Sequence, residues 1–185
     1  MMSFEEALSL LREHVKTENI IKHLFATQVL MQALARKFGE DEHRWGLAGL
    51  LHDLDWDYTK PTPDRHGLMS FEMLADKDLD PEICSAIKLH NYMLDIEPQT
   101  LMEKALYCSE MMTGFIVAVA LVKPSKKLDD VKVESVLKKF KEKSFASGAR
   151  REIMERCEPY LGITLEELVT ICLAEMKKIS GKLGL

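Results

Sequence analysis

The stretch Gly49-Leu50-Leu51-His52-Asp53-Leu54-Asp55 places a His-Asp pair at the end of an apolar helical segment. A helix that begins near Glu42 is predicted to run into this pair. An imidazole beside a carboxylate, held at the end of a buried helix, can bind a divalent metal ion. The same pair can be an ordinary last helical turn, in which the histidine interacts with the helix dipole. Residues elsewhere in the chain decide between these two interpretations.

The size and composition are those of one globular domain. The 185 residues are enough to bury a substantial core, and 46% are hydrophobic while 30% are charged. A net charge of -5 argues against a general nucleic-acid-binding surface. The first residues lack the features of a signal peptide, and the longest apolar run, residues 111–122, is too short to span a bilayer. We therefore expect a cytoplasmic protein without a membrane partner.

The cysteines predict no thiolate metal site, because none of them forms a CxxC pair. They lie within apolar helical patterns, so we expect them to be reduced core residues. They are Cys84, Cys108, Cys157 and Cys172.

Apolar periodicity and capping residues predict an all-α fold, and no alternating run indicates a sheet. The first expected helix follows the Ser3/Glu6 capping box, and the second spans about 19–38 with Gly39 as the stop. Further helices are expected at 42–53, 66–75 and 82–91, and a long one from the Thr100/Glu103 capping box to before Pro124. The last three are expected at 133–140, 149–160 and 165–179, with Gly181 as the end of the last. Residues 56–65 contain two prolines and are expected to be a loop. We expect one domain over residues 1–185, with a metal-site core at about 19–122 and C-terminal helices, 123–185, packed on it.

Several histidines and one glutamate occupy inward-facing positions or helix ends. Together with the His-Asp pair they give six candidate ligands: His23, His52, Asp53, His66, His90 and Glu110. Each has a simpler explanation on its own, since a lone histidine on an apolar face is usually a hydrogen-bonded core residue. A glutamate within a helix can likewise face solvent or pair with a lysine. His14 and His43 lie among charged neighbours, and we expect both at the surface.

The joint occurrence of the six candidates favours a metal centre. A buried carboxylate without a partner is costly, and several neutral imidazoles nearby need a common partner. Nitrogen and oxygen donors without sulfur suit Fe, Mn, Ni, Zn or Mg. Six donors are too many for one tetrahedral site with an open position, but they suit two metals about 4 Å apart. Asp53, central in the set, is the expected bridge.

In their order along the chain, these residues resemble the signature of the HD superfamily of metal-dependent hydrolases. That signature is an early His, a His-Asp pair and a late Asp on a bundle of helices, which His23, His52-Asp53 and Glu110 would supply. His66 and His90 match two further histidines of the two-metal members. The sequence around the pair, residues 110–114 and the lysine-rich residues 138–146 are similar to small stand-alone bacterial HD proteins.

The resemblance implies an HD-type helical bundle that hydrolyses a nucleotide or other small phosphate ester. It also implies a two-metal, hydroxide-generating site in which Asp53 is catalytic. Because the late acid is usually Asp and Glu110 stands in its place, the number of bound metals stays open. An HD-fold di-iron oxygenase and a metal-binding regulatory module without turnover remain alternatives, and a homo-oligomer is left open.

Basic side chains are expected to contact the substrate phosphate at the entrance. Lys60 and Arg65 flank the proline-containing segment before His66 and are the first candidates. The second are Lys138 and Lys141, from residues 123–151. This segment holds ten Lys/Arg against four Asp/Glu, a net charge of +6, whereas the remainder of the chain carries -11. The alternative explanation of the segment is a solvated face of an amphipathic helix.

Overall fold

The computed structural model describes residues 2–185, and within that range it consists of helices and connecting segments without a β-strand. The prediction of an all-α fold is confirmed. The α-helices are α1 (Phe4–His14), α2 (Glu18–Phe38), α3 (Glu42–Leu51), α4 (Trp56–Thr59), α5 (Leu68–Leu74), α6 (Pro81–Leu89), α7 (Leu101–Leu121), α8 (Val133–Phe140), α9 (Arg151–Met154), α10 (Cys157–Leu161), α11 (Leu165–Lys178) and α12 (Ser180–Leu183). Three short 3-10 helices lie between them: η1 (Pro63–Arg65), η2 (Tyr92–Leu94) and η3 (Leu128–Asp130).

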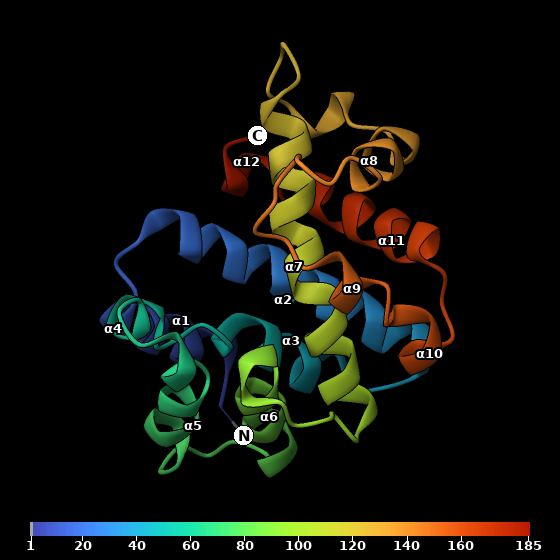
Figure 1. Ribbon diagram of the computed structural model, residues 1–185. Coiled ribbons are helices and arrows are strands. Elements are labelled where there is room, and N and C mark those ends of the chain that lie inside the picture. The colour runs from blue at the N-terminus through green and yellow to red at the C-terminus, as the bar shows by residue number, and fades with distance from the viewer. Residues whose placement is uncertain (1) are drawn as a thin grey trace.

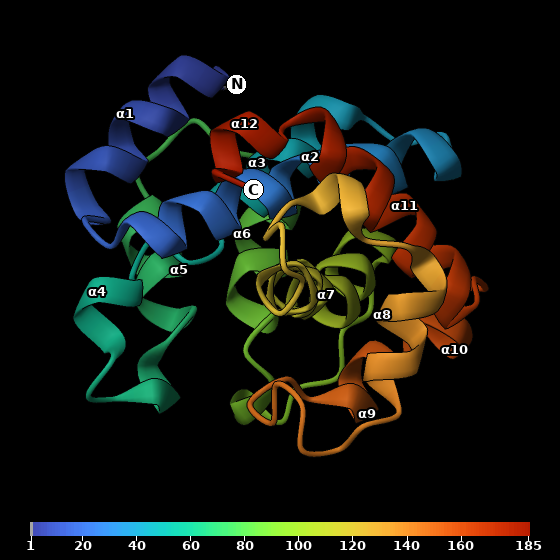
Figure 2. The same cartoon turned by 90° about the horizontal axis from the view of Figure 1, so that it is seen from above.

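Helix α7 is the centre of the molecule. It begins at the expected capping box, in which the Thr100 hydroxyl accepts from the Glu103 backbone and the Glu103 carboxylate accepts from that of Thr100. Seen end-on in Figure 2, it is surrounded by the other helices, with α2, α6, α8, α10 and α11 packed against it. α7 is long and apolar enough to cross a membrane, but 67% of its most apolar window is buried within the fold, as in a core helix.

Helices α2 and α3 lie against each other at unusually close range. A Cβ atom added to Gly49 would lie 2.7 Å from the backbone oxygen of Thr27 in α2. Only glycine therefore allows this approach, because any side chain would meet backbone rather than a movable side chain. The close packing brings the end of α3, with His52, next to the His23 region of α2.

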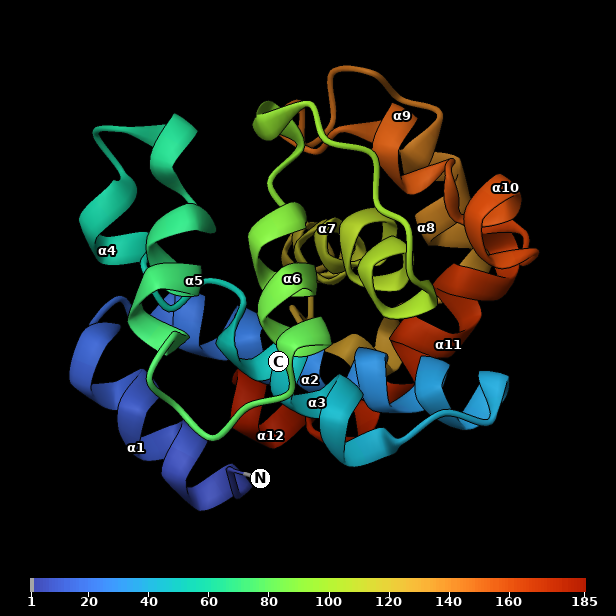
Figure 3. The same cartoon turned by 90° about the horizontal axis from the view of Figure 1, so that it is seen from below.

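The segment predicted as a loop, residues 56–65, contains helix α4 and the 3-10 helix η1, so that prediction is wrong in part. The prolines do not oppose these turns. Pro61 follows α4, and Pro63 is the first residue of η1, where no backbone N–H is needed. The next helix begins at Leu68 rather than His66, because Gly67 has a positive φ of 76°. Figure 3 shows α5 beside α6, which in turn packs on α3 and α7.

The C-terminal helices pack on α7 and α2 (Figure 1), but two predicted boundaries are wrong. The helix expected at 149–160 is divided into α9 and α10 by a turn at Glu155 and Arg156. The last helix is not ended by Gly181, which lies within α12; Gly184, with φ of 76°, ends that helix. The cysteines are free, and all are buried except the partly buried Cys84.

Candidate metal centre

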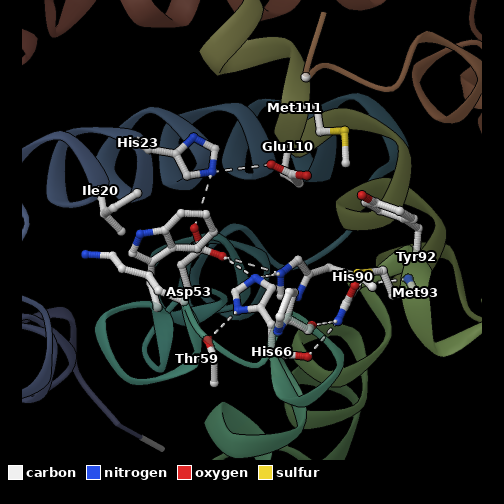
Figure 4. A pocket seen from close by; sticks show the side chains of 15 residues that line it. Ile20, His23, Asp53, Thr59, His66, His90, Tyr92, Met93, Glu110 and Met111 are labelled. Atoms are coloured by element: carbon white, nitrogen blue, oxygen red, sulfur yellow. Dashed lines mark hydrogen bonds and ion pairs between the residues drawn. The ribbon is translucent and has the colours of Figure 1, made fainter.

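The six candidate ligands converge from separate parts of the chain on one cavity (Figure 4). His23 comes from α2, His52 and Asp53 from the end of α3, His66 from the end of η1, His90 from the end of α6, and Glu110 from the middle of α7. The cavity has a volume of about 480 Å³. His52 is fully buried behind it, and the other five ligands line it.

Asp53 lies between two groups of donors. Its Oδ1 is 3.1 Å from Nε2 of His66 and 3.4 Å from Nε2 of both His52 and His90. Its Oδ2 is 3.8 Å from Nε2 of His23. The position between the two sides is the one expected of a bridging carboxylate.

The donors on each side lie within the reach of a single ion. On one side, Nε2 of His23 is 3.1 Å from Nε2 of His52 and 3.3 Å from Oε2 of Glu110. These three residues form a group that could hold a metal ion, and His52, Asp53 and His90 form a second. On the far side, Nε2 of His66 is 3.0 Å from Nε2 of His90. Glu110, although it replaces the shorter Asp, therefore reaches the cluster.

The backbone fixes the tautomer of two of the rings. Nδ1 of His52 lies 2.9 Å from the carbonyl oxygen of Gly49, and Nδ1 of His90 lies 2.5 Å from that of Ile87. A carbonyl oxygen only accepts, so each Nδ1 carries a hydrogen. In the neutral ring, Nε2 then carries a lone pair that points at the cluster.

The other two rings are fixed by side chains. Nδ1 of His66 donates to Oδ1 of Asp55 at 2.8 Å. Nδ1 of His23 is 2.8 Å from the hydroxyl of Thr113, which itself donates to the Glu110 carbonyl and so is free to accept from His23. When the rings are neutral, all four Nε2 lone pairs therefore face one another and the carboxylates of Asp53 and Glu110. An array made only of acceptors fits metal cations, and this orientation by second partners is usual for metal-binding histidines.

The charges of the cluster agree with that fit. Burial tends to raise the pKa of Asp53, but the neighbouring rings outweigh it and hold the pKa well below its ordinary value. Burial tends to lower the pKa of His66, but hydrogen bonds to Asp53 and Asp55 raise it to about 10. Burial lowers the pKa of His52 to about 4. The carboxylates therefore create a negative field that positive charge must balance.

Sequence reasoning assigned no role to Asp55, which the structure places directly behind His66. Asp55 is fully buried, and its Oδ2 accepts from the backbone N–H groups of Gly67 at 2.8 Å and Ser70 at 3.0 Å. Thr113 was missed in the same way. The only available signal for Asp55 was a second carboxylate two residues after the His-Asp pair, and a sequence does not show that this residue meets His66.

The basic residues proposed for phosphate contacts are separated by the fold. Lys60 lines the cavity, where its ammonium group donates to Asp57 at 2.7 Å. Arg65 instead binds both carboxylate oxygens of Glu72 at 3.0 and 2.8 Å, and it does not line the cavity. Lys138 and Lys141 line two other hollows of the surface. The structure thus brings only Lys60 to the six ligands.

His14 and His43 stay outside the centre, as expected, although both are partly buried rather than fully exposed. Nδ1 of His14 is 3.1 Å from the Tyr58 hydroxyl, and Nε2 of His43 is 2.9 Å from the Met2 carbonyl oxygen. These contacts give both rings ordinary structural roles.

The chain was compared with models of known protein families and with solved structures. A family model described as HD domain matches residues 20–175 of the chain, a range that includes all six candidate ligands. No solved structure matches the chain at a significant level.

Proposed function

The chain belongs to the HD-domain family, and on this basis we propose that it is a phosphohydrolase with two divalent metal ions that acts on a nucleotide or other small phosphate ester. The family suggests a metal-dependent phosphohydrolase in general terms. We propose in addition that there are two metals, chosen from Fe, Mn, Ni, Zn and Mg, and that the substrate is a small phosphate ester.

One observation carries the proposal. Four imidazole Nε2 lone pairs and two carboxylates point at one another, with Asp53 between the two sides. His23, His52, Asp53 and Glu110 would hold one ion, and Asp53, His66 and His90 the other. When bound, such a pair of ions would activate water and neutralise phosphoryl oxygens.

The residues of the chain have distinct tasks in this scheme. Asp53 remains ionised because the neighbouring rings depress its pKa, so it can serve as a bridge at neutral pH. The four imidazoles set the geometry without adding negative charge. With only two carboxylates in the set, two divalent ions would leave the centre positive, which favours an anionic phosphate over a neutral substrate.

The test is elemental analysis of the anaerobically purified protein, followed by a phosphate-release panel on the same sample. We expect two metals per chain and phosphate release. Two irons with a mixed-valent magnetic signal and no phosphate release would favour the oxygenase alternative. Bound metal with neither activity would favour a regulatory module.

Two variants test the ligands themselves. Asp53→Ala should abolish metal retention, because the proposed bridge serves both ions; full occupancy in this variant would refute the assignment. Glu110→Gln should lower the occupancy of one ion and leave the second in place. If Glu110→Gln retains both ions, Glu110 is not a ligand.

A further inference from the structure

The walls of the cavity above the candidate ligands are apolar and aromatic. Apart from the ligands, most of the lining consists of Ile20, Trp56, Pro63, Tyr92, Met93 and Met111. Figure 4 shows Ile20 on the side of His23, with Tyr92, Met93 and Met111 on the side of His90 and Glu110. A substrate whose phosphate lies at the ligands must therefore place its other part against these walls.

Two aromatic rings come from different segments of the wall. The Trp56 ring, from α4, stands edge-on to the His66 ring with centroids 5.4 Å apart, so it lies directly beside a candidate ligand. The Tyr92 ring, from η2, is covered by the guanidinium of Arg150 at 4.8 Å from its centroid. Such rings bind planar or apolar groups and bury much surface at little cost in conformational freedom.

The cavity walls have few groups that could stabilise additional negative charge. Among the described residues that line this cavity, Lys60 is the only Lys or Arg, and besides its pair with Asp57 it could serve one phosphate at most. The Asn91 amide is also occupied: its nitrogen donates to the carbonyls of Pro63 and His66, and its oxygen accepts from Met93. A second or third phosphoryl group would thus be desolvated against apolar side chains without a cation to compensate it.

We infer that the substrate carries a single phosphate on a compact group that has a planar or apolar face. This inference rests on the proposed function and narrows its substrate class. The inference excludes substrates with a polyphosphate chain, because the described cavity lining has no cations for the additional phosphoryl groups. The cavity volume of about 480 Å³ is that of a site for one small molecule.

The first test compares pairs of probes that differ in one feature. Ribose 5-phosphate and adenosine 5′-monophosphate share the same ester linkage, and only the second carries a planar base. We expect a KM at least about tenfold lower for adenosine 5′-monophosphate, because stacking of one base on aromatic side chains has an effect of this size. Adenosine triphosphate, which adds two phosphoryl groups to the same base, should have less than a tenth of the kcat/KM.

The second test assigns the discrimination to the walls. Trp56→Ala and Tyr92→Ala should raise the KM for adenosine 5′-monophosphate at least fivefold more than the KM for ribose 5-phosphate. Tyr58→Ala is the matched control, because Tyr58 is also an aromatic residue of α4 but lies half-exposed outside the cavity lining. It should leave the ratio of the two KM values unchanged.

A third measurement does not depend on metal or turnover. The chain has two tryptophans, and Trp45 is buried in the core, so a ligand in the cavity should quench mainly Trp56. Adenosine, which has the base but no phosphate, should quench the fluorescence of the metal-free protein, and Trp56→Phe should remove most of this signal.

The outcomes separate this inference from the proposed function. Phosphate release with equal KM values for the first pair, or with adenosine triphosphate preferred, would overturn the inference and leave the phosphohydrolase intact. If no probe releases phosphate although metal is bound, the proposed function fails. The adenosine titration then shows whether the aromatic walls bind a planar base, and absence of quenching overturns the inference.

Discussion

Replacing Asp55 by asparagine should empty one side of the metal centre without changing any proposed ligand. In the structure, Oδ1 of Asp55 accepts from Nδ1 of His66, while Oδ2 accepts from the backbone of Gly67 and Ser70. An asparagine has a single oxygen. If that oxygen keeps the two backbone bonds, the amide nitrogen must face Nδ1 of His66.

That contact places two donors against each other, and His66 can relieve it by moving its hydrogen to Nε2. The hydrogen then points at Asp53 and His90, and Nε2 no longer has a lone pair for a metal. Loss of such a supporting partner lowers metal affinity about 10- to 100-fold. This corresponds to about 1.4 to 2.8 kcal/mol.

The assay is metal stoichiometry after dialysis against a graded series of chelator concentrations. We expect the wild-type protein to retain two metals and Asp55→Asn to lose one of them at about 10- to 100-fold lower chelator concentration. Asp57→Asn is the control. Asp57 also accepts from two backbone N–H groups, those of Lys16 and Thr17, but it does not contact a histidine of the centre.

Asp57→Asn should therefore lower stability and retain both metals. Equal metal retention in Asp55→Asn and Asp57→Asn would refute the argument that the Asp55 carboxylate sets the tautomer of His66. Loss of both metals in Asp55→Asn would show that the two sides are not independent.

Three further predictions follow from single contacts. Gly49→Ala should destabilise the fold by about 1 to 3 kcal/mol in thermal or urea unfolding, because its Cβ would meet the α2 backbone. Gly114→Ala has open space and should instead stabilise helix α7 by about 0.5 to 1 kcal/mol; equal effects of the two would contradict the close-approach argument. Lys60→Ala should raise the KM for a phosphate substrate, whereas Arg65→Ala should not; an unchanged KM in Lys60→Ala would remove Lys60 from the entrance. Burial tends to raise the pKa of Asp57, but hydrogen bonds from Lys60 and Thr17 lower it below its ordinary value, so its stabilisation is present above about pH 4 and lost as the pH falls through the folded pKa. Acid unfolding of Asp57→Asn should show a correspondingly weaker pH dependence, and an unchanged dependence would contradict this assignment.

Local signals in the sequence were sufficient for most of the helices. The capping boxes at Ser3 and Thr100 are both formed, and Gly39 ends α2 with a positive φ, as predicted. Such features depend on residues three or four apart, which a sequence displays directly. The helix within residues 56–65 was missed because two prolines outweighed the helical turn between Asp55 and Thr59.

The sequence by itself determined the fold class, the family and the ordered set of candidate ligands, because these depend on residue types and spacing. Metal binding by the ligands stays a prediction. Only the tertiary structure decided which ring nitrogens face the cluster, that Asp55 supports His66, and that Lys60 but not Arg65 lines the cavity. The physical reason is that these depend on hydrogen bonds and contacts between separate helices, and the Gly49 approach of α3 to α2 helps to create them.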